Sequence, residues 1–187
     1  MSTPVGHAFC GVLVGTLVTW GRPLLSPWRD VAVFAALAMG PDLDFLPGIL
    51  IGKPGAFHHG PSHSLAFSAL VGVLIWLWAR WRGWQTPWRW GLCGGLIYLA
   101  QVLLDTLNAD TKAPFGVPLF WPFYDGYFIL ADPWFGDVRR HPMNWATMWH
   151  NLKLVGVETL VWGVPAAIAV WINNRRRGAS PRAGEGA

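Results

Sequence analysis

The sequence predicts an all-α protein, an integral membrane bundle of about four to five short helices with a polar site at one end. Apolar residues make up 53% of the 187 residues, and charged residues make up only 13%. The mean hydropathy is +0.34. Fourteen residues are tryptophan, which is typical of membrane–water interfaces. These observations favour a membrane protein over an ordinary soluble domain.

Apolar segments mark the expected helices. Only the last of them approaches cleanly the roughly 20 residues that a full membrane span needs. The second is broken by GPDLDFLPG, because Pro and Gly stop a helix, so some helices are expected not to cross fully. Asp30 and Ser62 are candidate N-caps of the second and third helices. The segments run roughly over residues 5–20, 30–51, 64–79, 90–107 and 154–172.

Positive charge is concentrated in the connections 21–29 and 80–89 and in the tail after residue 172. If the segments alternate across the membrane, these regions share one side, and the positive-inside rule places the carboxyl terminus in the cytoplasm. The tail is polar and rich in Gly and Ala. We therefore predict a membrane-embedded domain over residues 1–172, followed by a disordered basic tail over residues 173–187. Because topology explains the arginines, no nucleic-acid partner is expected.

Residues of the types that bind metal ions lie at the other ends of these segments, on the side of the membrane opposite the basic connections. The stretch FHHGPSHS, residues 57–64, holds three of the six histidines, and carboxylates stand at the ends of the second and fourth segments. Zinc binds imidazole nitrogen and carboxylate oxygen, and ionisable residues within membrane segments are functional candidates. We therefore predict a divalent metal site. Its expected ligands are His7, Asp42, Asp44, His58, His63 and Asp105.

The three aspartates Asp42, Asp44 and Asp105 are also the catalytic candidates, since a metal-bound water with a pKa of about 7 needs a group that orients it or takes its proton. The sequence leaves open whether Asp42 or Asp44 is a ligand or a general base. Asn108 and Asp110 are candidates to hydrogen-bond the ligands. In the last segment, Glu158 is expected to be a buried polar partner. The basic candidates to meet an anionic substrate are Lys112, Arg139 and Arg140.

Four stretches carry most of these residues: GHA at 6–8, GPDLDFL at 40–46, HHGPSHS at 58–64 and LLDTLNADTKAPFGVPLFWPF at 103–123. Their order and spacing resemble the YdjM-like family of inner-membrane, metal-dependent hydrolases. The resemblance covers roughly residues 5–125 and implies a multi-pass protein of the bacterial inner (cytoplasmic) membrane. In the family pattern the third motif reads His-Arg-Gly-x-Thr-His-Ser. That pattern maps onto His58 and His63, and it makes His59 a local substitution for arginine.

The chain departs from the family pattern at Gln101, because the family usually has a histidine four residues before the aspartate that Asp105 matches. An amide oxygen is a weak zinc ligand. The change therefore implies one ion fewer, a harder ion such as manganese or magnesium in place of zinc, or lost activity. His150, late in the chain, is a candidate to supply the missing nitrogen.

The order of the expected ligands is also similar to that in zinc-dependent phospholipase C and the fungal single-strand nucleases. This similarity implies hydrolysis of a phosphoester, such as a membrane phospholipid or a lipid-linked phosphate. The alternative is a non-enzymatic membrane scaffold or metal-binding protein with a degenerate site, which Gln101 favours. A permease would place polar residues through the depth of the bundle, whereas here they gather at one end.

Overall fold

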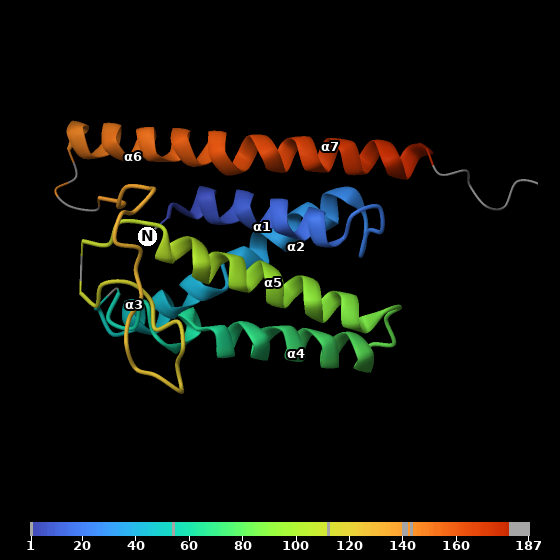
Figure 1. The fold of residues 1–187 in the computed structure, drawn as a ribbon, viewed down its shortest axis with the longest axis horizontal. Coiled ribbons are helices and arrows are strands. Elements are labelled where there is room, and N and C mark those ends of the chain that lie inside the picture. The colour runs from blue at the N-terminus through green and yellow to red at the C-terminus, as the bar shows by residue number, and fades with distance from the viewer. Residues whose placement is uncertain (1, 54, 112, 140–141, 143, 180–187) are drawn as a thin grey trace, which may run out of the picture.

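The computed structural model describes residues 2–53, 55–111, 113–139, 142 and 144–179, and these residues form an all-α bundle (Figure 1). The all-α class that the sequence predicts is therefore confirmed, although the helices are not all short. The elements in chain order are α1 (Pro4–Val18), α2 (Pro27–Ala38), the 3-10 turn η1 (Pro41–Asp44), α3 (Phe45–Leu50), the 3-10 turn η2 (Pro61–His63), α4 (Leu65–Trp81), α5 (Pro87–Thr106), α6 (Trp145–Glu158), the π-helical turn η3 (Thr159–Gly163) and α7 (Val164–Ala179).

The core of the bundle lies where α1 packs against α2, α5 and α7. Small residues set the close packing elsewhere in the bundle. In the hairpin of α4 and α5, a Cβ atom at Gly91 would stand 2.7 Å from the carbonyl oxygen of Gly72, so glycine is needed for the two backbones to approach. Close contact between small residues is typical of helix pairs in membranes. The main core cluster consists of Val12, Phe34, Ala38, Cys93, Ile97 and Ala166.

The second apolar segment is broken where the sequence predicts. α2 ends at Ala38, and η1 with α3 continues after a bend of 44°. Pro41 is the first residue of the 3-10 turn, a position where its missing N–H costs no helical hydrogen bond. The break places PDLD, residues 41–44, at one end of the bundle instead of inside a continuous helix.

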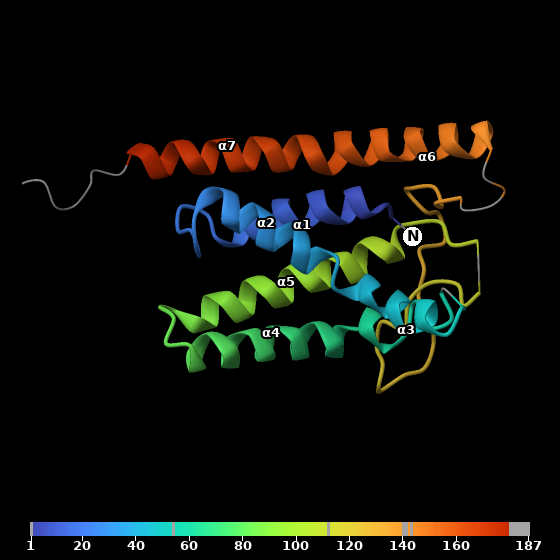
Figure 2. The same cartoon turned by 180° about the vertical axis from the view of Figure 1, so that it is seen from behind.

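The last apolar segment begins earlier than predicted. α6, η3 and α7 form one continuous helix beside α1 (Figures 1 and 2). The helix starts at Trp145 rather than at residue 154, because Asn144 caps it and accepts a hydrogen bond from the backbone N–H of Thr147 at 2.9 Å.

The same helix also ends later than predicted. It runs through Ala179, so residues 173–179 are helical and do not belong to the predicted disordered tail; residues 180–187 lie outside the described part of the chain. The guanidinium of Arg175 lies 3.9 Å from the ring centroid of Trp171. Such stacking, together with the attraction of cations to a helix carboxyl terminus, stabilises the extra turns.

Among the described residues, one helix has the length and composition of a membrane span, Trp145–Arg176 with 32 residues. The bent pair of Pro27–Ala38 and Pro41–Leu50 adds a second if its two helices form a single span. The helices α1 and α4 are apolar but shorter. The α1–α2 connection, the α4–α5 connection and the end of α7 lie at the same end of the bundle (Figures 1 and 2), where Arg89 donates to the carbonyl oxygen of Arg22 at 2.6 Å.

Both predicted N-caps are wrong. α2 begins at Pro27, and Asp30 in its first turn accepts a hydrogen bond from the backbone N–H of Leu25 at 2.8 Å. α4 is capped by Ser64, which accepts from the N–H of Phe67. The reason at α4 is that residues 61–63 form their own 3-10 turn, which delays the helix and leaves Ser62 free to face the polar site.

Candidate metal centre

The six predicted ligands come together in space. The start of α1 and the end of α5 lie at the same end of the bundle, beside the described amino terminus (Figure 1). Four elements contribute the ligands: the first turn of α1, the 3-10 turn η1, the connection that contains η2, and the last turn of α5. In that order, the elements supply His7, then Asp42 and Asp44, then His58 and His63, and finally Asp105.

Two histidines and two aspartates form a closed ring, which we call the central ring: His7, Asp42, His63 and Asp105. His7 Nε2 lies 3.6 Å from both Asp42 Oδ2 and Asp105 Oδ1. His63 Nε2 lies 3.8 Å from Asp42 Oδ1 and 3.6 Å from Asp105 Oδ2. These separations are too long for hydrogen bonds. They are close to the roughly 3.3–3.6 Å between two ligands that bind one zinc ion at about 2.0–2.2 Å.

The central ring is almost fully shielded from solvent. The side chains of His7 and His63 are 0% exposed and that of Asp105 is 1% exposed, whereas that of Asp42 keeps 14%. Burying carboxylates at this depth costs free energy unless they are paired or coordinate a cation. The arrangement therefore suits a bound cation better than a set of isolated polar groups.

Asp44 lies behind the ring and orients two of the imidazoles. Its Oδ1 accepts a hydrogen bond from Nδ1 of His58 at 2.9 Å. Its Oδ2 lies 3.1 Å from Nδ1 of His63 and accepts from the hydroxyl of Ser62 at 3.0 Å. An ionised carboxylate only accepts, so each imidazole carries a proton on Nδ1, and Nε2 is the atom left to bind a metal ion. Carboxylates behind metal-binding histidines commonly have this geometry.

Gln101 orients His7 in the same way. Its side-chain oxygen accepts from Nδ1 of His7, and its amide donates to the carbonyl oxygen of His7 at 3.1 Å. His150, the predicted substitute for the missing histidine, lies elsewhere, because its Nε2 hydrogen-bonds the carbonyl oxygen of Asp137 at 2.9 Å. The prediction for His150 is therefore wrong, and Gln101 acts as an orienting partner where a ligand was expected.

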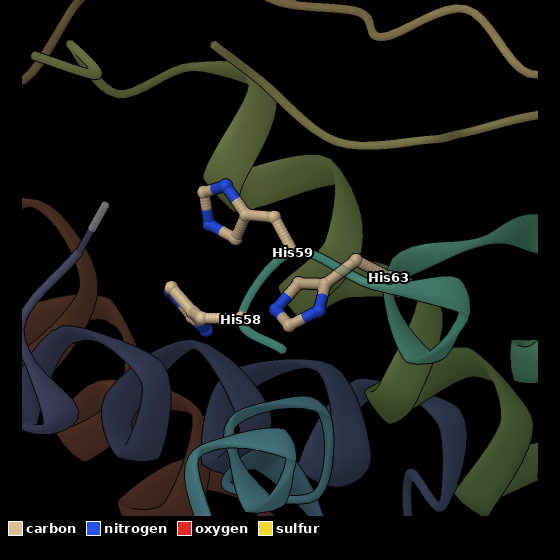
Figure 3. Close-up of side chains that lie close together, drawn as sticks. All are labelled: His58, His59 and His63. Atoms are coloured by element: carbon tan, nitrogen blue, oxygen red, sulfur yellow. The ribbon is translucent and has the colours of Figure 1, made fainter. Parts of the chain in front are cut away.

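His59, which the sequence suggests is a local substitution, belongs to the site. It is 4% exposed, and its Nδ1 lies 3.3 Å from Asp110 Oδ2. Its ring centroid lies 4.1 Å from that of His58 and 4.9 Å from that of His63, so the three rings form one group (Figure 3). Its φ of +57° is rare for a residue other than glycine and is typical of functional positions.

One pattern unites the four histidines of the site. In each of them Nδ1 faces a side-chain oxygen of the protein. Within the described part of the chain, Nε2 of each one is buried and has no hydrogen-bond partner. Anchored Nδ1 and free Nε2 atoms are typical of imidazoles that bind a metal ion. The four are His7, His58, His59 and His63.

The carboxylates also change the pKa of the histidines in the connection before α4. Burial lowers the pKa of His63, but Asp42, Asp44 and Asp105 raise it by more, to about 9. Burial is the main reason why the pKa of His58 lies below its ordinary value, although the hydrogen bond to Asp44 opposes this. The negative potential at His63 therefore favours a cation.

The amino terminus of α1 is held by Glu158 and Asn108. Glu158, on α6, is buried and accepts a hydrogen bond from the backbone N–H of Thr3 at 3.0 Å. The amide of Asn108 donates to the hydroxyl of Ser2 at 2.7 Å. The expectation that Glu158 is a buried polar partner is confirmed, and these bonds fix the start of the helix that carries His7.

The predicted basic residues give little information about the site. Lys112 and Arg140 lie outside the described residues. The backbone N–H of Arg139 donates to the side-chain oxygen of Asn151 at 3.0 Å, and the Asn151 amide donates back to the Arg139 carbonyl oxygen. Their expected contact with an anionic substrate stays a prediction.

Comparison with known proteins gives a family and a location. A family model described as YdjM inner membrane protein matches residues 1–179. It therefore covers every described element through α7 and extends well beyond the motifs. Among curated proteins and solved structures, none matches the chain. The family description agrees with the membrane location that the composition indicates and with the inner membrane that the resemblance implies, and it names no reaction.

Proposed function

The chain belongs to the YdjM inner membrane protein family, and from that premise we propose that it is a membrane-bound, metal-dependent hydrolase that cleaves a phosphoester. The observation that carries the proposal is the central ring, in which Nε2 of His7 and of His63 faces the carboxylates of Asp42 and Asp105 and has no hydrogen-bond partner among the described residues. Imidazole and carboxylate ligands together suit zinc best, and manganese or magnesium are the alternatives.

The residues of the central ring would hold the ion. When bound, a divalent ion supplies an acidic water and polarises a phosphoryl oxygen. Asp105 is 1% exposed and serves as a ligand. Asp42 keeps 14% exposure, so it is the ligand that water reaches most readily. Asp44 keeps His58 and His63 in their binding tautomer, and the three aspartates thus have different roles.

A lipid substrate is supported by an apolar pocket that reaches the site. The pocket has a volume of about 640 Å³, and Asp44 and Ser62 stand in its lining. Because both residues hydrogen-bond each other beside His63, a hydrocarbon chain in this pocket would bring its head group close to the central ring. The apolar part of the lining comes from α2, η1, α4 and α5, and includes Val33, Leu37, Leu43, Phe67, Val71 and Tyr98.

The proposed topology is multi-pass, with the carboxyl terminus in the cytoplasm and the site at the extracytoplasmic face. It is supported by the basic residues of the α1–α2 connection, the α4–α5 connection and α7. Both connections and the end of α7 lie at the same end of the bundle (Figures 1 and 2). At that end Arg89 bonds Arg22, and Arg176 lies over Trp20 at 5.3 Å. Basic residues on the cytoplasmic side are the general rule for membrane proteins.

Hydrolysis of a lipid substrate tests this function directly. The full-length protein in detergent is loaded with zinc, manganese or magnesium and incubated with phospholipid micelles. We expect release of a phosphorylated or dephosphorylated product that stops on chelation and returns with the metal. If the protein binds these metals but cleaves none of the phospholipids or lipid-linked phosphates, the hydrolase proposal is wrong. The protein is then a metal-binding scaffold without turnover.

A further inference from the structure

The two carboxylates of the central ring divide their oxygens between two histidines. Asp42 turns Oδ2 toward His7 and Oδ1 toward His63, at 3.6 and 3.8 Å. Asp105 turns Oδ1 toward His7 and Oδ2 toward His63, at 3.6 Å in both cases. A carboxylate that bridges two ions directs one oxygen to each of them, and both aspartates have this orientation.

We propose that the site holds two divalent ions, with Asp42 and Asp105 as bridging ligands and His59 as a ligand of the second ion. This inference rests on the proposed function and adds the number of ions and one ligand to it. The first ion would bind between the bridging oxygens and His7. The second would bind between the opposite oxygens and the group of His58, His59 and His63.

The candidate ligands indeed fall into two groups. His7, Asp42 and Asp105 each offer an atom within 4.8 Å of the atoms offered by the other two. The same limit holds among His58, His59 and His63, whose rings are grouped in Figure 3. Each group alone supplies three ligands, which is the usual number of protein ligands for a catalytic zinc ion.

A single ion in the central ring would leave part of the site unexplained. Across the described residues, Nε2 of both His58 and His59 is buried without a hydrogen-bond partner. Unsatisfied buried acceptors are costly, and here their Nδ1 atoms are anchored by Asp44 and Asp110. A second ion next to His63 would give both of these lone pairs a ligand role.

The backbone at His59 supports its assignment as a ligand. A φ of +57° is uncommon for a residue other than glycine, and here it accompanies a histidine that is only 4% exposed and lies in the group. Strain of this kind persists where the surrounding structure or a function requires it. In two-ion hydrolases the ions lie about 3.5–4 Å apart and contact both the attacking and the leaving oxygen of a phosphoester.

Manganese loading tests the proposal without an activity assay. The full-length protein in detergent is stripped, reconstituted with Mn²⁺ and analysed for metal content and by electron paramagnetic resonance. The wild type should hold about two ions per chain and show the spectrum of an exchange-coupled pair, because ions about 3.5–4 Å apart interact magnetically. His59→Asn should hold about one ion and show the spectrum of isolated Mn²⁺.

The choice of variants keeps the outcomes distinct. Asparagine tolerates a left-handed backbone, so His59→Asn removes the imidazole with the least added strain, and His59→Gly, which also adopts a positive φ, replaces it if that variant does not fold. His150→Asn is the control, since His150 bonds the Asp137 carbonyl oxygen, and it should keep the coupled pair.

Three results would overturn a specific part of the proposal. One isolated ion in the wild type would refute the two-ion site while leaving the metal centre intact. A coupled pair that survives in His59→Asn would remove His59 from the ligands. A wild type that binds no ion at all would refute the proposed function itself.

Discussion

Gln101 accepts a hydrogen bond from Nδ1 of His7 and returns one from its amide to the His7 carbonyl oxygen at 3.1 Å. The amide is therefore fixed, and Nε2 of His7 points toward Asp42 and Asp105. A glutamine that looks like a lost ligand in the sequence is thus the group that orients His7, a proposed ligand. This relationship weakens the argument that Gln101 marks a degenerate site.

Replacing Gln101 by leucine should weaken metal binding about 10–100-fold, because His7 loses the acceptor that sets its tautomer and ring orientation. Gln101→Glu keeps an acceptor at the same position and should bind with an affinity close to that of the wild type. Competition with a chromogenic chelator measures both dissociation constants. An unchanged dissociation constant in Gln101→Leu would contradict the orienting role.

Asp44→Asn should also lower the metal affinity about 10–100-fold. Asparagine has one accepting oxygen, and its amide group donates, so it cannot accept from both His58 and His63 as Asp44 does. The comparison is Asp132→Asn, an exposed aspartate of the α5–α6 connection, which should bind metal normally. Equal affinity in the two variants would exclude Asp44 from the site.

Gly6→Ala should destabilise the protein by about 1–3 kcal/mol, as overpacking does. A Cβ atom at residue 6 would stand 2.6 Å from Glu158 Oε2, whereas one at Gly156 would meet nothing within 4 Å among the described residues. Gly156→Ala is therefore the matched control and should be neutral or slightly stabilising. Thermal unfolding in detergent gives the comparison, and equal melting temperatures would show that the Glu158 contact does not fix the start of α1.

Val71→Trp should reduce turnover of long-chain lipid substrates about tenfold or more, while cleavage of a short, water-soluble phosphodiester changes little. Val71 lines the pocket that reaches Asp44. The control is Val73→Trp, on the same helix but in a separate apolar groove between α4 and α5. Equal losses on long and short substrates, or the same loss in both variants, would argue against acyl-chain binding in this pocket.

The sequence predicts the main features of the fold because strong local signals produce them. The apolar segments predict where the helices lie, and Gly40 with Pro41 predicts the break after α2. Helix ends were harder to place. Because residues 61–63 form a 3-10 turn, α4 is capped by Ser64 and not by the predicted Ser62. The last helix continues into residues that look like a tail in the sequence, where Arg175 stacks on Trp171.

The six predicted ligands come together as the motif order implies, but the division of roles among them follows from three-dimensional contacts. Whether Asp44 orients or ligates depends on which nitrogen of His58 and His63 it faces. The place of His59 in the site depends on Asp110, which lies far along the chain, and on a left-handed backbone. No residue pattern in the sequence marks either feature.

Metal content of the purified protein tests the central claim most directly. Wild type, Asp105→Asn and the control Asp30→Asn, which alters a buried carboxylate at the Leu25 backbone, are reconstituted with zinc, manganese or magnesium and analysed for bound metal. We predict stoichiometric metal in the wild type and in Asp30→Asn, and loss of metal in a folded Asp105→Asn. A folded wild type that retains none of the three ions would contradict the metal centre.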